Sequence, residues 1–403
     1  MRVLWVCNVV IPEISDEFGF KRRNVGGWLS GMWNQIRKNP QINLGICVPI
    51  IDYEKMKDGI TKYNNKYYSY KWQNQIEGYE EQVQRFSDIL EQFNPDVVHI
   101  WGTEYIHTMA MVEACKSKKI IDKVIINIQG IIYKYTEKYM YGLEDSYKDD
   151  IYISMKKRCP YEINALKNVQ YVCGRTDWDK ASVMLINPNI KYYHCGEILR
   201  DIFYDNNDKW NYKKSKKHSI FISQANYPVK GLHVILSQLS ELKKYYPDLL
   251  IRISGTDITK SDSVYSRMIY KEIVKSNLLE TITFLGMLSE EQMYREYLRA
   301  NVFLSPSLIE NSSNSICEAM SVGTPVVSSY VGGVPSIIVH GENGFLYPLD
   351  EPYMMTFYIK KLFEDIDLTE KISDNEIKRF NEFNNRQSSV KQVIELYNKI
   401  SKL

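Results

Sequence analysis

The chain has 403 residues, of which 44% are hydrophobic and 25% are charged, as is typical of a soluble globular protein. This length exceeds the usual size of one hydrophobic core, so two domains of about 200 residues each are expected. A net charge of +2 argues against general electrostatic binding to nucleic acid. Seven scattered cysteines with no C-x-x-C pair argue against a disulfide framework or a zinc site and favour a reduced, cytoplasmic compartment.

The start of the chain is apolar and enters a predicted strand directly. Polar residues follow Met1 to Cys7, so we expect no signal peptide, and no run of about 18 apolar residues predicts a membrane span. The 31 tyrosines are unusual, because many lie beside lysines, as at 63–72 and 133–141. Amphipathic aromatics next to cations can rest on a lipid surface, which predicts peripheral contact with the inner face of the membrane. A general enrichment in Lys, Asn, Ile and Tyr explains the same clusters.

The first half of the chain alternates buried strands with amphipathic helices. Apolar runs predict strands at 1–10, 42–49, 96–100, 122–128, 169–173 and 190–194. Helical periodicity predicts helices at 24–37, 78–93, 105–118, 150–167 and 176–187. This β-α repetition predicts a doubly wound parallel sheet, whose ligands gather at the carboxyl ends of its strands.

A glycine pair, Gly26-Gly27, lies where the first helix begins after the first strand. Glycines at this place let backbone N–H groups approach an anion closely, and the helix start adds its positive dipole end. The alternative is a loop that merely turns the chain.

Two later strands are followed by polar side chains. Glu104 and His107 come after the strand at 96–100, and Gln129 comes after the strand at 122–128. Glu104 and His107 can exchange protons, whereas the amide of Gln129 does not titrate and can only form hydrogen bonds. A solvated glutamate and a histidine that packs or caps a helix are the alternatives for the first two residues.

Arg175 follows a predicted strand and precedes a helix that Thr176 or Asp177 would cap. Its side chain would then face the ligand end of the sheet, where a guanidinium group can bind an anion. An ion pair with Asp177 or Asp179 is the alternative.

The periodic pattern breaks at 198–217, which we interpret as the connection between two domains. Beyond it, strands are predicted at 219–223, 249–254, 282–285, 301–304 and 325–328. Helices are predicted at 232–245, 290–299, 315–321, 351–365, 369–380 and 386–402. The predicted domains are 1–197 and 198–385, followed by a last helix at 386–403.

Lys230 stands just before Gly231 and the helix at 232–245. A lysine at a helix start interacts unfavourably with the helix dipole, which argues for an anion nearby. A solvated lysine is the alternative.

The stretch 305–335 carries two glutamates in a distinctive setting. Glu310 lies in a loop of small polar residues after a strand, and Glu318 lies in the first turns of the next helix. Free N–H groups at such a helix start suit a phosphate, and a carboxylate accepts two hydrogen bonds from a vicinal diol. The alternative is that Glu318 complements the helix dipole and Glu310 is a solvated charge, which does not explain the glycines and prolines around both.

The motifs of this stretch resemble those of a known family. They are E-x7-E at 310–318, E-A-M-x-x-G-x-P-V-V at 318–327, G-G-x-P at 332–335 and G-x-N-G-x-L at 341–346. Together they resemble the donor-binding block of the retaining glycosyltransferases of family 4, the glycosyl transferases group 1, which have the GT-B fold. The resemblance implies an α/β chain with two Rossmann-like, doubly wound parallel-sheet domains facing a cleft, and a last helix that packs back on the first domain.

The resemblance implies a role for each matching residue. Glu310 would contact sugar hydroxyls near the reacting carbon, Lys230 the diphosphate, and Glu318 the ribose diol. The expected catalytic residues are Glu310, Lys230 and Gln129. Glu104 and His107 are the candidates on the acceptor or sugar side. The other implied donor-binding residues are Gly26, Gly27, Arg175, Gln224, Gly286, Met287, Leu288, Asn311, Ser312, Ser313, Asn314 and Ser315. For 286–288, which resembles the family's base-contact loop, a simple turn is the alternative.

The chain departs from the family pattern at two positions. Many members have a histidine where this chain has Gln129, so no acid or base is carried over there. The family arginine that grips the diphosphate falls on Gln224 or Ala225. Arg175 or the helix dipoles must therefore neutralise the remaining charge.

We therefore expect a cytoplasmic, metal-independent retaining glycosyltransferase without a cofactor. It would move a hexose or N-acetylhexosamine from a nucleotide diphosphate sugar, a UDP-sugar in the first place, to a hydroxyl of a glycan or lipid-linked acceptor in bacterial surface polysaccharide synthesis. One alternative is a non-catalytic sugar-nucleotide-binding protein or partner subunit, in line with the missing histidine and arginine. A UDP-sugar 2-epimerase is another, although it needs several acids and histidines facing the cleft, and the six histidines here have no obvious acid partner.

Overall fold

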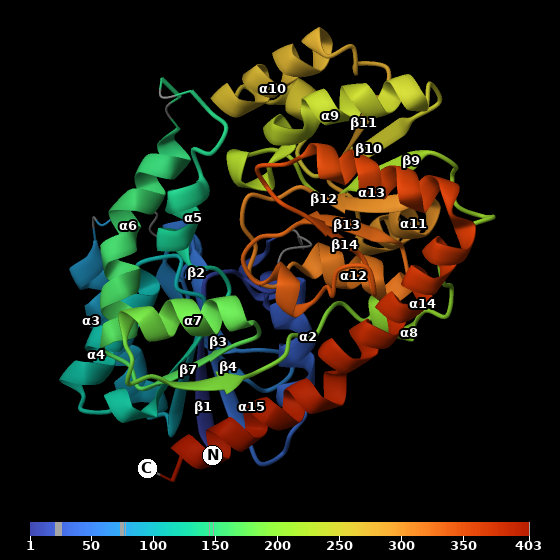
Figure 1. Cartoon of the computed structure of the whole chain (residues 1–403). Helices are drawn as coiled ribbons and strands as arrows, with labels where there is room; N and C mark the ends of the chain where they lie inside the picture. Colours follow the sequence, from blue (N-terminus) through green and yellow to red (C-terminus); the bar gives the residue numbers. More distant parts are fainter. Residues whose placement is uncertain (21–25, 73–75, 77, 145, 148, 403) are drawn as a thin grey trace. The chain divides into compact units, whose positions relative to one another are not determined.

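The computed structural model of the chain describes residues 1–20, 26–72, 76, 78–144, 146–147 and 149–402. These residues form two compact units (Figure 1). Unit 1 comprises Met1–Thr136, Asp150–Ile198 and Asn385–Leu403, and unit 2 comprises Glu137–Asp149 and Leu199–Asn384. The segment Glu137–Asp149, which lies within the expected first domain 1–197, groups with unit 2.

Unit 1 is built on an eight-stranded sheet with the strand order β3-β4-β2-β1-β5-β6-β7-β8. Its strands are β1 (Arg2–Cys7), β2 (Asn43–Ile50), β3 (Gly59–Ile60), β4 (Lys66–Lys71), β5 (Val97–Trp101), β6 (Val124–Asn127), β7 (Tyr171–Gly174) and β8 (Lys191–His194). All neighbours pair in parallel except β3 and β4, which are antiparallel at one edge. The sequence did not indicate these two strands, because their stretch is rich in Lys and Tyr and lacks an apolar run.

Helices pack around this sheet. They are α1 (Pro12–Ser15), α2 (Gly27–Ile36), α3 (Tyr79–Phe93), α4 (His107–Ser117), α5 (Ile132–Lys138), α6 (Asp150–Lys167), α7 (Asp177–Ile186) and α15 (Arg386–Ile400). The last helix is fastened to the sheet, because the hydroxyl of Tyr397 on α15 lies 2.8 Å from Trp5 Nε1 and 2.6 Å from His99 Nδ1. The two ends of the chain therefore lie close together in unit 1 (Figure 1).

Unit 2 contains a six-stranded sheet in which all neighbouring strands are parallel, with the order β11-β10-β9-β12-β13-β14. Its strands are β9 (Ser219–Ile222), β10 (Leu250–Ser254), β11 (Ile282–Gly286), β12 (Val302–Ser305), β13 (Val326–Ser329) and β14 (Phe345–Tyr347). Its helices are α8 (Ile202–Asp205), α9 (Leu232–Tyr245), α10 (Val264–Lys275), α11 (Glu290–Arg299), α12 (Asn314–Val322), α13 (Tyr353–Glu364) and α14 (Ile366–Phe383).

The strands and helices follow from their local sequences. Strands β9 and β12 are fully buried, as expected for parallel strands whose two faces are both covered, so each has three consecutive apolar residues, 220–222 and 302–304, rather than an alternating pattern. Helix α7 starts with a capping box, in which the Thr176 hydroxyl accepts a hydrogen bond from the N–H of Asp179 and the Asp179 carboxylate accepts one from the N–H of Thr176. This confirms Thr176 as one of the two predicted caps.

Each sheet reverses its strand order beside its first strand. In unit 1 the reversal falls between β1 and β5, and in unit 2 it falls between β9 and β12. Open parallel sheets bind ligands outside the carboxyl ends of the two strands at such a switch point. The predicted α/β class with a doubly wound, mainly parallel sheet is confirmed in each unit, and it directs attention to the loops that follow β1, β5, β9 and β12.

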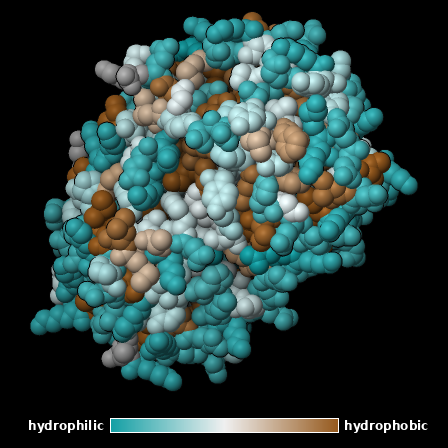
Figure 2. Space-filling view, viewed as in Figure 1, coloured by the Kyte–Doolittle hydropathy of each residue, from teal (hydrophilic) through white to brown (hydrophobic). Residues whose placement is uncertain are grey.

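The surface gives no sign of a membrane-spanning element in the described residues, since none of their helices is both long and apolar enough to cross a bilayer. Hydrophilic side chains predominate on the face in Figure 2, and hydrophobic ones form scattered groups. The Lys- and Tyr-rich cluster at 63–72 contains strand β4, in which Tyr67, Tyr68 and Tyr70 are at most 4% exposed. These tyrosines pack in the core of unit 1, so they do not supply the lipid-facing aromatics that the sequence suggested.

Candidate active site

The loops at the switch point of unit 2 bring a lysine and a glutamate together. After β9, the short 3-10 helix η4 (Pro228–Lys230) carries Lys230, and after β12 the loop 306–313 carries Glu310. The Lys230 ammonium donates a hydrogen bond of 2.6 Å to Glu310 Oε1, and the Ser307 hydroxyl donates one of 2.8 Å to the same oxygen. Burial lowers the pKa of Lys230, but the carboxylate of Glu310 and the hydroxyl of Tyr227 more than offset this, so the pKa is raised and the lysine stays charged.

Two glycines allow the backbone to approach the loop of Glu310 closely, one from the loop of Lys230 and one from the loop after β13. Gly231 has a φ of +71°, and a Cβ there would lie 1.9 Å from the carbonyl oxygen of Pro306. Gly332 has a φ of +52°, and a Cβ there would lie 1.9 Å from the carbonyl oxygen of Glu310. No other residue fits either place, since a side chain would meet backbone and a positive φ is strained for it. The K-G and G-G motifs of the sequence therefore position Lys230 and Glu310.

The loop of Glu310 leads directly into helix α12, whose first turn is open. Within the described part of the chain, the side chain of the N-cap residue Ser313 caps no backbone N–H of the helix. The side-chain oxygens of Ser312, Asn314 and Asn226 are buried and have no hydrogen-bond partner among the described residues. The N–H groups of this helix start and the Ser312 hydroxyl can donate hydrogen bonds to an anionic ligand, and the two amide oxygens can accept them from hydroxyl groups of the same ligand.

Glu318 lies on α12 and has two protein partners. Its Oε1 accepts a hydrogen bond of 2.6 Å from Arg200 Nη2, and its Oε2 accepts one of 3.0 Å from the Tyr297 hydroxyl. Burial raises the pKa of the Glu318 carboxyl, and the guanidinium of Arg200 opposes the shift. Sequence reasoning missed Arg200, because it lies 118 residues from Glu318 in a stretch without periodicity.

The remaining predicted residues of unit 2 also lie at the carboxyl end of its sheet. Gln224 follows β9, where its Cγ would lie 3.4 Å from a Cβ added to Gly255 after β10. The N–H of Gly255 donates to the carbonyl of Gly286, which ends β11. Met287 follows and is 74% exposed. Adjacent strands thus place 224, 255 and 286–288 side by side, while Asn311 is buried within the loop of Glu310.

In unit 1, the glycine pair lies where the sequence placed it. Gly26 has a φ of +72° and is the N-cap of α2, which begins at Gly27, and no side chain caps this helix start within the described residues. The two residues before the pair, Asn24 and Val25, lie outside the described residues. Both glycines stay predicted anion contacts.

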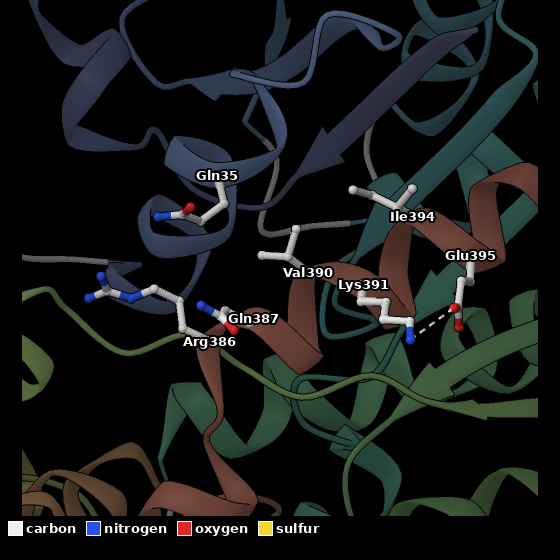
Figure 3. Close-up of a pocket in the computed structure, with 7 residues that line it drawn as sticks. All are labelled: Gln35, Arg386, Gln387, Val390, Lys391, Ile394 and Glu395. Atoms are coloured by element: carbon white, nitrogen blue, oxygen red, sulfur yellow. Dashed lines mark ion pairs between the residues drawn. The ribbon is translucent and has the colours of Figure 1, made fainter.

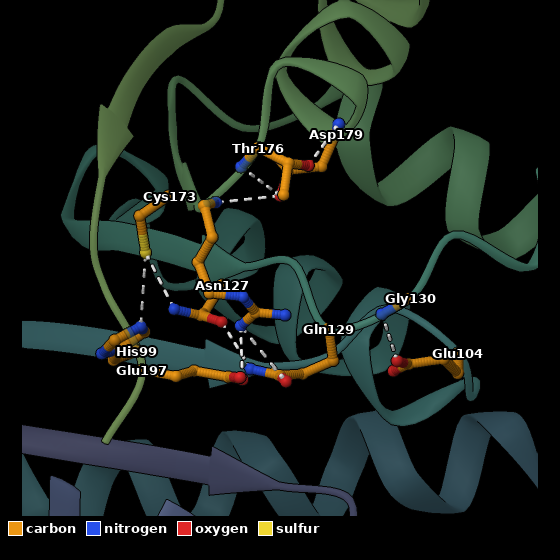
Figure 4. A network of polar contacts seen from close by, with 10 residues as sticks. His99, Glu104, Asn127, Gln129, Gly130, Cys173, Thr176, Asp179 and Glu197 are labelled. Atoms are coloured by element: carbon orange, nitrogen blue, oxygen red, sulfur yellow. Dashed lines mark hydrogen bonds and ion pairs between the residues drawn. The ribbon is translucent and has the colours of Figure 1, made fainter. Parts of the chain in front are cut away.

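Gln129, Arg175 and Glu197 contact one another, and the half-buried Gln129 and the buried Glu197 are labelled in Figure 4. Gln129 Nε2 donates a hydrogen bond of 2.6 Å to Asn127 Oδ1, and Arg175 Nη1 lies 3.4 Å from Gln129 Oε1. Arg175 is ion-paired with Glu197, and their side chains are 2% and 4% exposed. The guanidinium of Arg175 therefore contacts Glu197 and Gln129 rather than Asp177 or Asp179. Sequence reasoning missed Glu197, which follows β8 without any motif.

Glu104 and His107 have different surroundings. Glu104 is partly exposed, and its Oε1 accepts a hydrogen bond of 2.7 Å from the N–H of Gly130. His107 is 1% exposed in the core, stacked on Tyr70, and burial lowers the pKa of its imidazole to about 3. His107 is thus neutral at physiological pH, and of the two only Glu104 is open to a ligand.

No metal centre accompanies these residues in the described part of the chain. No group of three or more His, Cys, Asp or Glu side chains there is arranged to hold a metal ion. A pocket of about 510 Å³ lies between α2 and α15, where Gln35 of α2 faces residues 386–395 of α15 (Figure 3). No predicted site residue lines it, and its Lys391 and Glu395 pair with each other at 3.9 Å.

Comparison with known proteins points to one family. Residues 204–379 match the family described as "Glycosyl transferases group 1". The chain is 25% identical over 170 residues to the D-inositol 3-phosphate glycosyltransferase of Corynebacterium urealyticum, a match that covers 42% of this chain and 40% of that protein. The chain therefore matches less than half the length of this curated relative.

Two solved structures resemble the whole chain. Sucrose-phosphate synthase of Thermosynechococcus elongatus has a TM-score of 0.74 at 15% identity and covers 99% of both chains. HepE of Anabaena, solved in complex with UDP-glucose, has a TM-score of 0.67 at 15% identity and covers 99% of this chain and 100% of its own. At these identities the likeness shows the fold.

Proposed function

We infer from the match of residues 204–379 to the glycosyl transferases group 1 family, and from the GT-B fold of the whole chain, that this protein is a glycosyltransferase with a sugar-nucleotide donor. One observation carries the inference most strongly. At the switch point of unit 2, the ion pair of Lys230 and Glu310 lies next to the open first turn of α12. A cation, a hydrogen-bond acceptor and free N–H groups together match a diphosphate attached to a sugar.

The proposed donor is a UDP-sugar carrying a hexose or N-acetylhexosamine. HepE, of the same fold, was solved with UDP-glucose, which supports uridine as the base. Glu318 would bind the ribose diol, because a carboxylate has about four acceptor positions and Arg200 and Tyr297 occupy two of them. Met287 and its neighbours would contact the base.

Lys230 and the start of α12 would stabilise the departing diphosphate. Lys230 has three N–H donors, of which Glu310 and Tyr227 engage two, so one remains for a phosphate oxygen. As the bond between the sugar's anomeric carbon and the phosphate oxygen breaks, its electron pair passes to the diphosphate. Fixed donors that face this developing charge lower the barrier, because they need no reorganisation during the reaction.

We propose a retaining, metal-independent reaction of the family 4 type. The acceptor oxygen bonds to the anomeric carbon on the face that the diphosphate leaves, and the hydroxyl proton passes to the departing phosphate oxygen. In this step no protein side chain has to gain or lose a proton, which agrees with the neutral amide of Gln129 at that position. Glu310 would hold sugar hydroxyls near the reacting carbon. A glycan or lipid-linked acceptor in cytoplasmic surface-polysaccharide synthesis completes the proposal.

A panel of sugar nucleotides tests the function. The purified chain is incubated with UDP-glucose, UDP-galactose, UDP-N-acetylglucosamine and GDP-mannose, and both free nucleotide and sugar are followed. Slow release of nucleotide with retention of sugar configuration supports the transferase. Interconversion of one sugar nucleotide into another would instead indicate an epimerase, and binding without turnover a non-catalytic protein.

A further inference from the structure

The switch point of unit 1 carries a carboxylate in an unusual cradle. Glu104 lies in the loop after β5, and Asn8 follows β1, so the two residues flank the place where the strand order reverses. Parallel sheets bind their ligands at this place. In unit 1, the partly exposed carboxylate of Glu104 lies at this switch point.

Two glycines make room for this carboxylate. Gly102 has a φ of +86°, and a Cβ there would lie 2.2 Å from Glu104 Oε2. A Cβ on Gly130 would lie 3.3 Å from Glu104 Oε1. The side chain therefore folds back over the end of the sheet, into space that any larger residue at 102 would fill. A merely solvated glutamate has no need of such a cradle.

Hydrogen bonds of Thr103 hold the loop of Glu104 in place. Thr103 Oγ1 lies 3.0 Å from the carbonyl oxygen of Gly130 and 2.6 Å from Glu162 Oε1. The carboxyl of Glu162 also accepts hydrogen bonds of 3.0 Å from the N–H groups of Ile132 and Tyr133 at the start of α5. The loops after β5 and β6 thus form one unit, which fixes the Glu104 carboxylate before any ligand arrives.

The groups that surround the Glu104 carboxylate define the ligand. Its Oε1 accepts from the N–H of Gly130 (Figure 4), and its Oε2 lies 3.4 Å from Asn8 Nδ2. Asn8 Oδ1 is buried and has no partner among the described residues. Both the carboxylate and this amide oxygen accept hydrogen bonds, so the ligand must donate them. Arg158 Nη1 donates to the backbone carbonyl of Glu104, and this nearby positive charge disfavours a cationic ligand.

We propose that Glu104 is the acceptor-binding residue of unit 1, whose carboxylate receives a hydrogen bond from a hydroxyl group of a neutral glycan or other polyol. This role rests on the proposed function, which supplies the need for an acceptor hydroxyl. It would align the attacking oxygen and so contribute through orientation. Gln129 has both polar ends of its amide engaged within unit 1 and would support the site from its edge.

Ligand-observed saturation-transfer NMR on the full-length chain tests the proposal, with methyl α-D-glucopyranoside, glycerol and methylammonium as probes. We expect the wild-type protein to transfer saturation to at least one neutral polyol and not to methylammonium, and Glu104→Ala to lose at least about four fifths of that signal, as for a lost charge-assisted hydrogen bond. Glu91→Gln, on an exposed glutamate of α3, is the matched control and should keep the signal.

Three results would overturn the proposal: no transfer to either polyol from the wild-type protein, an equal signal from Glu104→Ala, or a preference for methylammonium. Glu104→Gln keeps the size of the side chain and covers the case in which the alanine variant does not fold. Hydrolysis of the sugar-nucleotide panel by the wild-type protein is measured separately. A protein that binds polyols through Glu104 but ignores every sugar nucleotide would refute the proposed function and not this site.

A pH series separates binding from mere structural support. Burial raises the pKa of the Glu104 carboxyl, so the polyol signal should weaken as the pH falls through that raised pKa, whereas Glu104→Gln should give a flat profile. Among the described residues, the titratable groups that act on Glu104 are Arg158 and Glu162 of α6 and Glu197 after β8. The series is therefore run in the Glu162→Gln background, where that neighbour no longer titrates. A flat profile with Glu104 present would contradict the proposal.

Discussion

The two units hold their site carboxylates in opposite ways. In unit 2, each glutamate has a cation against it, Lys230 for Glu310 and Arg200 for Glu318. In unit 1, Glu104 is held by the neutral N–H of Gly130, and the ion pair of Arg175 and Glu197 is buried under Gln129. Unit 2 is thus charge-balanced before its ligand arrives and offers N–H donors to an anion. Unit 1 presents acceptors, which suit the hydroxyl groups of a neutral ligand.

The largest effect should come from breaking a charge pair in unit 2. Arg200→Met leaves the Glu318 carboxylate buried with only the Tyr297 hydroxyl as a partner, which we expect to lower the free energy of unfolding by about 3 kcal/mol. Arg295→Met is the control, because Arg295 pairs with Glu291 on the exposed face of α11 and should cost less than about 0.5 kcal/mol. Urea unfolding measures both, and equal losses would contradict the difference in burial.

The next largest effect concerns turnover. Glu310→Ala removes the proposed contact to the sugar, and we expect the rate of nucleotide release to fall by about 100-fold, or about 2.7 kcal/mol in barrier height. Glu291→Ala, on the exposed side of α11, should leave the rate unchanged. An unchanged rate in Glu310→Ala would remove this residue from the site and leave its pair with Lys230 as a structural contact.

The third effect compares a glycine in a tightly packed loop, Gly231, with a glycine in an open turn, Gly286. Gly231→Ala drives a methyl group into the backbone of Pro306, whereas a Cβ on Gly286, at nearly the same φ, meets nothing within 4 Å. We expect Gly286→Ala to cost about 1 kcal/mol, from backbone strain alone, and Gly231→Ala at least twice as much. Thermal unfolding of both variants checks this, and equal shifts would mean that the loops of Lys230 and Glu310 separate freely.

The last and most pH-dependent effect should follow the loss of a buried acid in unit 1. Burial raises the pKa of Glu162 to about 8, so its carboxyl is mostly neutral in the folded protein at pH 7 but ionised in the unfolded chain. Glu162→Gln is neutral in both states, so this proton uptake no longer affects its stability. A pKa raised in the folded state means that the folded protein binds this proton more tightly. The stability that Glu162 contributes is therefore complete below its ordinary pKa and is lost as the pH rises through about 8.

Urea unfolding between pH 5 and 9 measures this contribution. The wild-type protein should lose stability across the range relative to Glu162→Gln, and Glu91→Gln, on an exposed glutamate, should follow the wild type. Parallel pH profiles of the wild type and Glu162→Gln would show that Glu162 is ionised in the folded protein.

The fold of unit 2 could be predicted from the sequence, and so could the place of its candidate site residues in one group of loops, because their signals are local. Apolar runs marked β9 and β12, and Lys230-Gly231 and the 305–335 stretch each fall within one loop and one helix start. Residues that join the candidate site from distant parts of the sequence have no local signal of this kind. Arg200 meets Glu318 only because the fold joins distant segments, and no periodic pattern surrounds it.

The site of unit 1 was harder to predict for the same physical reason. Its parts come from the ends of β1, β5, β6 and β8, so Asn8, Glu104, Gly130 and Glu197 share no motif. The strands β3 and β4 were not predicted, because β3 has only two residues and the three buried tyrosines of β4 do not form an apolar run. Glu104 is partly exposed whereas His107 is buried, and their spacing in the sequence could not predict this difference.

The central claim is that the loops of Lys230 and Glu310 bind a uridine diphosphate, and isothermal titration calorimetry with UDP and its sugars tests it most directly. We expect the wild-type protein and Lys244→Gln, which alters a lysine that is 67% exposed, to bind UDP alike, and Lys230→Gln to bind it at least about tenfold more weakly. No heat of binding for UDP or any UDP-sugar, or equal affinities for wild type and Lys230→Gln, would contradict the claim.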